Sequence, residues 1–366
     1  CGRIEELNPD ASLTPQSLEE RINKEETIEY IKEVLEGAIN KRLSFLMQES
    51  HSLFSLFSDV EIQDSTIITL NEKLDDKFKG SGGNASSSSI KVDFIYSLKY
   101  CKVVKITLHE GNCPDQSIAK NDSYTAPIGS LHLQDLGYFL LERFKLLDMD
   151  GRYYLSRLLD TVNVYLSPED STCVDLPEYI DKEFKHTNIV DITVYIGAKE
   201  RLPVRLVAYR LPEQVVAERR RKAIENARKK GCTLSKKHLN RLRFSCFITN
   251  VPKEILKPEV IGTVYRIRWQ IELMFKYWKS LLNIHILKGT RAERIQCIIY
   301  ARLLSIVLIT QICGYAAKCA WNTCKKELSI HKTISWLLSR FRDIPNNADN
   351  VLTRLENTLH RLCKQK

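Results

Sequence analysis

The sequence contains 11 cysteines but lacks a Cys-x-x-Cys pair and any Cys/His run with zinc-finger spacing. Structural zinc sites need sulfur or imidazole ligands at such short spacings, so the sequence gives no support for a zinc-binding module. The simplest interpretation is a set of reduced thiols, which is typical of proteins in a reducing compartment. We therefore expect a cytoplasmic protein.

The amino terminus lacks an initiator methionine and an apolar signal region, since the chain begins Cys-Gly-Arg-Ile-Glu-Glu. This start predicts a fragment of a longer reading frame. A mature lipoprotein would also begin with cysteine, but nothing else in the chain suits an envelope protein. Residues 297–317 are apolar for long enough to span a bilayer, but Arg302 and Gln311 interrupt them. We expect a buried core helix there and no membrane partner.

The chain carries an excess of cations, with 55 Lys and Arg against 45 Asp and Glu, a formal net charge of +10 and a pI near 9.0. Clustered cations gain free energy by releasing the counterions of phosphates, so this charge favours a polyanionic partner. The apolar fraction of 43% is ordinary for a globular protein. At 366 residues the chain is longer than most single cores, which predicts two or three structural units.

The periodicity of apolar residues predicts a mixed α/β protein. A Thr-Pro start signal opens a helical region at 14–49, and short segments rich in Val, Ile, Tyr and Thr follow as expected strands. These strands occupy residues 60–70, 90–98, 103–109, 131–134, 153–158, 162–166, 189–196, 204–209 and 244–249. Three strands in succession, then a strand, a helix and a strand, favour a mixed sheet covered by helices.

Changes of composition along the chain predict five regions. A basic helix-like run at 217–231 lies within a β-rich stretch, and after Pro258 the chain is helical nearly to its end. The expected regions are an N-terminal helical region truncated upstream (1–55), the first part of a core (56–160), a β-rich insertion with the basic helix (161–250), the second part of the core with Glu272 (251–320) and a C-terminal helical region (321–366).

The segment 260–282 has a helical period and no Gly or Pro after Gly262. At about 100° per residue, four polar side chains fall within about 60° of one another, beside an apolar arc. The four are Tyr265, Arg268, Glu272 and Lys279. A carboxylate flanked by cations and a phenol suits metal-bound phosphate, because the carboxylate can bind the metal while the cations meet phosphate oxygens. The alternative is a solvated helix face with an i,i+4 ion pair.

The pattern Tyr-x2-Arg-x3-Glu-x6-Lys in this segment resembles the signature of the DDE transposases of the insertion-sequence-four family. The resemblance extends upstream. Residues 64–83 are similar to the family's first catalytic-strand segment and 131–144 to its second, and residues 151–158 place Arg157 where the family carries an arginine. The similarity covers about residues 13–315 and implies a ribonuclease-H-like mixed sheet with helices, interrupted by a β-rich insertion.

Membership of this family implies an enzyme that cleaves and rejoins DNA, with Asp64, Asp135 and Glu272 as catalytic residues and metal ligands. Two Mg²⁺ ions about 4 Å apart would serve each active site, with Mn²⁺ as a substitute. The resemblance further implies cut-and-paste transposition through hairpin formation and strand transfer. Its partners would be double-stranded DNA of transposon ends and target, bound by a homodimer. Tyr265, Arg268, Lys279 and Arg157 would bind the phosphates of the DNA end.

Several of these residues have structural alternatives. Asp135 stands where an N-cap residue would precede a helix beginning at Leu136, and Asp64 could be a surface residue of an edge strand. Phe244, with Phe247 second, is the candidate for stacking on a flipped base, although both could simply pack in the core. The basic run contributes four further DNA-binding candidates, which could instead form a solvated helix face: Arg220, Arg221, Lys229 and Lys230.

Two alternative functions remain open from the sequence. A transposase-derived DNA-binding protein without catalysis is one, and the presence of Asp64, Asp135 and Glu272 argues against it. A structure-specific nuclease with the same ribonuclease-H-like fold is the other. The Tyr265 to Lys279 pattern disfavours it, since a simple nuclease does not need the cations that would bind the DNA end during hairpin formation.

Overall fold

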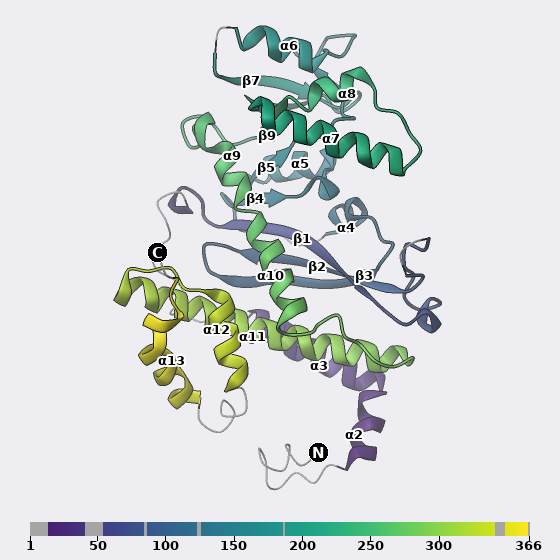
Figure 1. Ribbon diagram of the computed structural model, residues 1–366, viewed down its shortest axis with the longest axis vertical. Helices are drawn as coiled ribbons and strands as arrows, with labels where there is room; N and C mark the ends of the chain where they lie inside the picture. Colours follow the sequence, from purple (N-terminus) through teal and green to yellow (C-terminus); the bar gives the residue numbers. More distant parts are fainter. Residues whose placement is uncertain are drawn as a thin grey trace. The chain divides into compact units, whose positions relative to one another are not determined.

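The computed structural model describes residues 14–40, 54–83, 86–122, 126–185, 187–340 and 348–364 (Figure 1). The part of the predicted N-terminal helical region beyond residue 40 lies outside the described residues. The chain forms two compact units. Unit 1 comprises Cys1–His51, Asp64–Cys113 and Gln270–Lys366, and unit 2 comprises Ser52–Gln63 and Pro114–Trp269. Among the described residues, no two cysteines are joined by a disulfide.

The strands predicted from the sequence are all present in a mixed sheet with the order β3-β2-β1-β4-β5-β9-β8-β7-β6. β1 pairs in parallel with β4, and β4 with β5, whereas β2/β3, β5/β9, β9/β8, β8/β7 and β7/β6 are antiparallel. The strands are β1 (Val60–Thr69), β2 (Ser89–Ser97), β3 (Lys102–Glu110), β4 (Leu131–Gln134), β5 (Tyr153–Arg157), β6 (Val164–Tyr165), β7 (Ile189–Ile196), β8 (Leu202–Arg210) and β9 (Phe244–Thr249). The α/β class is therefore confirmed.

Unit 1 packs its helices around the β2/β3 hairpin. Thr14 caps α2 (Pro15–Ile22) by accepting the Ser17 amide at 3.1 Å, which is the role expected of the Thr-Pro start. Phe94 of β2 is fully buried and meets Phe275 and Trp278 edge-on, at 6.0 and 4.6 Å between ring centroids. The helices are α2 (Pro15–Ile22), α3 (Glu25–Asn40), α10 (Trp269–Ser280), α11 (Ala292–Cys324), α12 (Ile330–Ser339) and α13 (Ala348–Leu362), with a 3₁₀ turn at Glu72–Leu74.

Helix α11 contains the apolar stretch that is long enough to cross a bilayer. Half of its most apolar window is buried inside the protein, and the helix packs against α3 and α13. Gln311 on α11 donates a hydrogen bond to the Ala38 carbonyl of α3 at 2.9 Å. Arg302 donates to the carbonyls of Asn283 and Ile286. Both polar residues that interrupt the stretch thus have protein partners, as a core helix requires.

Unit 2 has its core between one face of the β5-β9-β8-β7 strands and the helices α5 and α6. Phe144, Tyr154, Leu206 and Ile248 are among its buried side chains. Its helices are α4 (Asp115–Asn121), α5 (Leu141–Met149), α6 (Leu176–Glu183), α7 (Glu213–Lys229), α8 (Lys236–Arg241) and α9 (Pro258–Arg266), with 3₁₀ turns at Phe54–Leu56 and Leu136–Tyr138. The five-region division of the chain, including an insertion at 161–250, stays a prediction.

The single helix expected at 260–282 is wrong, because the segment forms α9 and α10 with a turn between them. The amides of Ile267 and Arg268 each donate to a carbonyl three residues earlier, at 3.1 Å, which is 3₁₀ geometry. Arg268 is buried, with only 6% of its surface exposed. The burial of Arg268 among protein partners outweighs the helix propensity of the residues that follow Gly262. Tyr265, Arg268, Glu272 and Lys279 therefore do not lie on one face of a single helix.

Candidate active site

Asp64, Glu272 and Lys279 line one open pocket of about 550 Å³ in unit 1. β1 supplies the half-buried Asp64, whose Oδ1 accepts the Ser65 amide at 2.8 Å. α10 supplies the exposed Glu272 and, two turns later, the half-buried Lys279. The remaining lining residues are Ser65, Thr66, Phe275, Lys276, Ser280 and His285. Two carboxylates and two lysines therefore face the same hollow.

The rotation of α10 about its axis is set by its buried aromatic side chains. Phe275 and Trp278 are 7% and 2% exposed and contact each other at 5.0 Å as well as Phe94. Residues on the other side of an α-helix point away from such an anchor. This packing leaves Glu272 on the solvent side of the helix, directed at the pocket that Asp64 also lines.

Asp135 belongs to unit 2 and follows the last residue of β4. Its side chain is 44% exposed, and its Oδ1 lies 3.5 Å from a guanidinium nitrogen of Arg268. A 3₁₀ turn, not an α-helix, begins at Leu136, and the Asp135 side chain makes no capping hydrogen bond to it. The capping interpretation of this aspartate is therefore not supported, and its carboxylate faces a cation.

Tyr265 and Arg268 are buried next to Asp135 within unit 2. The Tyr265 hydroxyl donates to the Gln134 carbonyl at 3.2 Å, and its ring lies 5.3 Å from that of Phe247. Burial raises the pKa of Tyr265 to about 12, so the phenol remains protonated and can keep donating. These contacts attach α9 to the end of β4. The expected contact of both residues with DNA phosphate stays a prediction.

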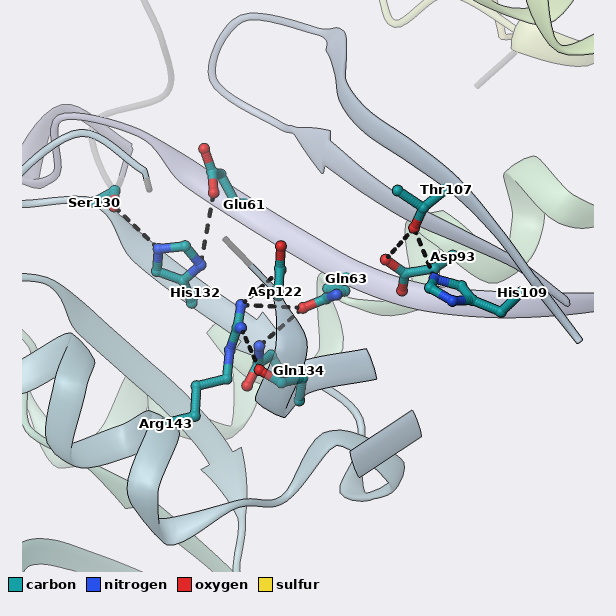
Figure 2. Close-up of polar contacts among 11 residues, drawn as sticks. Glu61, Gln63, Asp93, Thr107, His109, Asp122, Ser130, His132, Gln134 and Arg143 are labelled. Carbon is teal, nitrogen blue, oxygen red and sulfur yellow. Dashed lines mark hydrogen bonds and ion pairs between the residues drawn. The ribbon is translucent and has the colours of Figure 1, made fainter. Parts of the chain in front are cut away.

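A buried polar network holds β1 and β4 in register (Figure 2). Gln63 and Gln134 are register partners, and the Gln134 side-chain amide donates to the Gln63 Oε1 at 3.0 Å. Arg143 donates to the same oxygen at 3.4 Å and to the Asp122 carboxylate at 3.3 Å. Asp64 follows Gln63 in the chain, as Asp135 follows Gln134. The network therefore acts on the two strand positions directly before the candidate aspartates.

His132 belongs to the same buried layer. Its Nε2 lies 3.2 Å from the Ser130 hydroxyl, and its Nδ1 lies 3.6 Å from a carboxylate oxygen of Glu61 (Figure 2). Burial, followed by the positive charges of Arg143 and Arg152, lowers the pKa of His132 to about 3. The ring is therefore neutral at pH 7, so the distance to Glu61 does not represent an ion pair between two charges.

This depressed pKa predicts a pH dependence of stability. As pH falls through about 6.5, the unfolded chain binds a proton at His132 and the folded chain does not, so stability is present above pH 6.5 and lost progressively toward pH 3. The wild type should lose up to about 1.4 kcal/mol per pH unit more than His132→Gln between pH 6 and 5. Urea unfolding at each pH measures this difference. The exposed His360→Gln should keep the wild-type slope, and a His132→Gln variant that also keeps it would contradict the prediction.

The basic helix predicted at 217–231 is α7, and its cations differ in their surroundings. Arg221 lies 2.9 Å from Glu218, and Lys229 lies 2.9 Å from Glu225, so both are paired on their own helix. Arg220 donates to the Leu239 carbonyl at 3.3 Å. Lys230 is exposed just after the helix. The DNA-binding roles of these four residues stay predictions.

The aromatic candidates from β9 are packed inside unit 2. Phe244 is 4% exposed and stacks on Phe184, with 5.8 Å between ring centroids. Phe247 is 7% exposed and lies against Tyr209 and Tyr265. These contacts fit the core-packing alternative that the sequence left open. Base stacking by either ring would require it to leave these contacts, and it remains a prediction.

Two ionisable residues of the pocket were not predicted as site residues from the sequence, Lys276 and His285. Lys276 is one turn beyond Glu272 on α10, so its i+4 spacing was the available signal. His285 follows the helix in a loop and has no periodic signal. The i+4 spacing of Lys276 from Glu272 therefore predicts a place in the pocket, as the spacing of Lys279 does.

The donors that the structure gathers are hard oxygens. Asp64 and Glu272 share the pocket of unit 1, and Asp135 belongs to unit 2. Within the described residues there is no group of three or more His, Cys, Asp or Glu side chains placed to hold a metal ion. The donor chemistry of the two pocket carboxylates, without a thiol beside them, nevertheless suits Mg²⁺ or Mn²⁺ in preference to a soft metal.

Comparison with known proteins places these residues in a family. The chain matches a family model described as "Transposase DDE domain" over residues 56–308. It is 31% identical over 339 residues to the transposase for insertion sequence element IS231B of Bacillus thuringiensis subsp. berliner, covering 89% of this chain and 71% of that protein. It is also 31% identical over 343 residues to the transposase for IS1151 of Clostridium perfringens, covering 90% and 72%.

Among solved structures, the chain is similar to a piggyBac transposase synaptic complex with hairpin DNA, determined by cryo-EM. The TM-score is 0.41 and the sequence identity 10%, over 84% of this chain and 58% of that chain. The sequence matches are much stronger and span Asp64, Asp135 and Glu272. The chain therefore belongs to the DDE transposases of insertion-sequence elements, in the insertion-sequence-four family, whose members are enzymes of DNA cleavage and transfer.

Proposed function

We propose that the protein catalyses cut-and-paste DNA transposition with Asp64, Asp135 and Glu272 as its catalytic carboxylates, on a ribonuclease-H-like core. The observation that carries this proposal is the shared pocket of Asp64, Glu272 and Lys279 in unit 1. Asp64 lies more than 200 positions before Glu272 and Lys279, in the segment that resembles the family's first catalytic strand, and Glu272 and Lys279 match the family signature. The Gln63–Gln134 register partners, each followed by an aspartate, add support for Asp135 as the third carboxylate.

The carboxylates would hold divalent cations. Asp64, Asp135 and Glu272 are oxygen donors of the type that Mg²⁺ prefers, and Mn²⁺ could substitute. When bound, two such ions would supply an activated nucleophile and a stabilised leaving oxygen for phosphodiester cleavage. Glu272 is exposed on α10 and Asp64 is half-buried on β1, so both can meet a ligand from solvent.

The cations near these carboxylates have separate tasks in the proposal. Lys276 and Lys279 on α10 bind the phosphates of a DNA strand lying in the pocket, where their charge offsets that of the backbone. Arg268 holds the Asp135 carboxylate in place across a 3.5 Å contact in unit 2. Arg268 therefore orients a catalytic group, and Tyr265 supports the same strand end through the Gln134 carbonyl. Cleavage, hairpin formation and strand transfer would use one set of carboxylates in turn, within a homodimer on DNA.

The test is cleavage of a labelled duplex that carries the terminal repeats flanking the gene. The wild type should nick this duplex and form a hairpin in Mg²⁺, and it should do neither in EDTA. Denaturing gels resolve nicked strand, hairpin and flush-cut product. Nicking of any duplex without hairpins would identify a nuclease instead, and tight binding without cleavage in Mg²⁺ or Mn²⁺ would identify a DNA-binding protein; either result overturns the proposal.

A further inference from the structure

Three exposed cations on the outer side of α7 share two glutamates of the same helix. Arg221 contacts both Glu218 and Glu225, Lys222 contacts Glu218 at 3.2 Å, and Lys229 contacts Glu225. Exposed pairs of this kind leave little net field for a polyanion. The number of basic residues in the run therefore overstates the positive potential of its solvent face.

Arg219 points the other way, toward β9. Its guanidinium donates to the Phe244 carbonyl at 3.3 Å and to the Ser245 hydroxyl at 3.2 Å. Arg219 is half-buried, in contrast to the exposed Arg221 two residues later. The inner side of α7 thus carries an arginine fixed against the sheet by neutral acceptors.

Arg157 shares that face of the sheet. It is the last residue of β5 and the register partner of Phe247 on β9, so these two side chains project from the same face. Ser245, two residues before Phe247, projects from this face as well. The Tyr265 ring packs on Phe247 from the same side. Arg157, Arg219 and the Asp135-bound Arg268 with Tyr265 therefore gather on one face of unit 2.

Arg157 and Arg219 have no carboxylate partner among the residues that the structure describes. Burial lowers the pKa of Arg219, and the neighbouring charge of Arg157 lowers it further. The positive charges of Arg157 and Arg219 on this face repel each other, and an anion bound between them would offset that repulsion. A phosphate oxygen pair matches the fork of donors that each arginine presents.

We propose that Arg157 and Arg219 together grip one backbone phosphate of the DNA end, on the face of unit 2 that carries Asp135. The inference rests on the proposed function only in taking DNA as the ligand. It assigns the binding role on α7 to its inward arginine, and it assigns none to the paired Arg221. Arg219 acts as a DNA-binding residue beside the catalytic group, and the neutral acceptors of β9 hold its guanidinium ready.

The proposed phosphate contact is tested by measuring the binding of a fluorescent 40-base-pair duplex that ends in the terminal repeat. The measurement is made in EDTA at several salt concentrations. Arg219→Gln and Arg157→Gln should each weaken binding about tenfold and lower the slope of log affinity against log salt by about 0.9. The double variant should weaken binding by well under the roughly hundredfold product, because both arginines hold the same phosphate. Arg210→Gln is the matched control, because the Arg210 guanidinium lies 3.0 Å from the Asp181 carboxylate, and it should stay within about twofold of wild type.

Arg219→Lys separates loss of contact from loss of fold. Lysine keeps the positive charge but lacks the paired N–H donors of the guanidinium group. The Arg219→Lys variant should therefore bind DNA less tightly than the wild type and more tightly than Arg219→Gln, with an unchanged melting temperature. Wild-type affinity and salt slope in Arg219→Gln would overturn the inference, as would full additivity in the double variant. These binding results do not depend on cleavage, so an inactive wild type that still shows the arginine effects would refute only the transposition proposal.

Discussion

Glu272→Gln is expected to lower the rate of Mg²⁺-dependent DNA cleavage by on the order of 10³-fold, with DNA affinity within about twofold of wild type. Glutamine keeps the shape of the side chain and removes the negative charge that a metal ligand needs. Glu272 is exposed on α10, and the helix is anchored by Phe275 and Trp278, so the substitution should not disturb folding. Single-turnover cleavage of the terminal-repeat duplex, alongside anisotropy binding, gives both quantities.

The matched control for this variant is Glu293→Gln. Glu293 is also an exposed glutamate on a helix of unit 1, in the first turn of α11, and it does not line the pocket. It should cleave at the wild-type rate. If Glu272→Gln cleaves within about threefold of wild type, Glu272 is not a catalytic carboxylate and the role inferred from the signature is lost. Equal loss of cleavage and binding would point instead to a role in holding DNA.

The strands were predictable because their signal is local. Each is a short run of β-branched and aromatic residues bounded by turn residues, and in β2 Ile90, Val92 and Phe94 also alternate with polar residues. β4 occupies the four residues expected, Leu131–Gln134. The pairing of β1 with β4 across more than sixty residues of intervening chain has no local signal, so it was not predicted from the sequence.

The candidate site was predictable in part, for a different reason in each residue. Glu272 and Lys279 follow the period of one helix, and Asp64, a candidate only by resemblance to the family, lines the same pocket; the catalytic roles stay predictions. Arg268 was placed wrongly on that helix, because its burial against Tyr265 and Asp135 is a tertiary contact that helical periodicity does not encode. The inward side chain of Arg219 is hidden for the same reason, since a run of cations gives no sign of which one faces the sheet.

Arg143→Met is expected to cause the largest loss of stability of any change considered for this protein. The Asp122 side chain is 1% exposed and that of Arg143 is 9% exposed, and their 3.3 Å ion pair is joined to Gln63 and the Ala119 carbonyl (Figure 2). Removing the cation from a buried pair costs about 3–5 kcal/mol, because the carboxylate keeps its desolvation penalty. Calorimetry should show a melting temperature lower by about 6–15 °C.

Two further variants test whether the loss of stability comes from the burial of the ion pair or from the loss of an ion pair in general. Arg221→Met removes an ion pair whose partners are 64% and 47% exposed, so it should leave the melting temperature close to that of the wild type. Asp122→Asn added to Arg143→Met should recover part of the lost stability, because the buried negative charge disappears with it. A loss below about 1 kcal/mol in Arg143→Met itself would show that the network does not hold unit 2 together. The expected loss would instead tie the register of β1, which contains Asp64, and β4, which precedes Asp135, to one buried arginine.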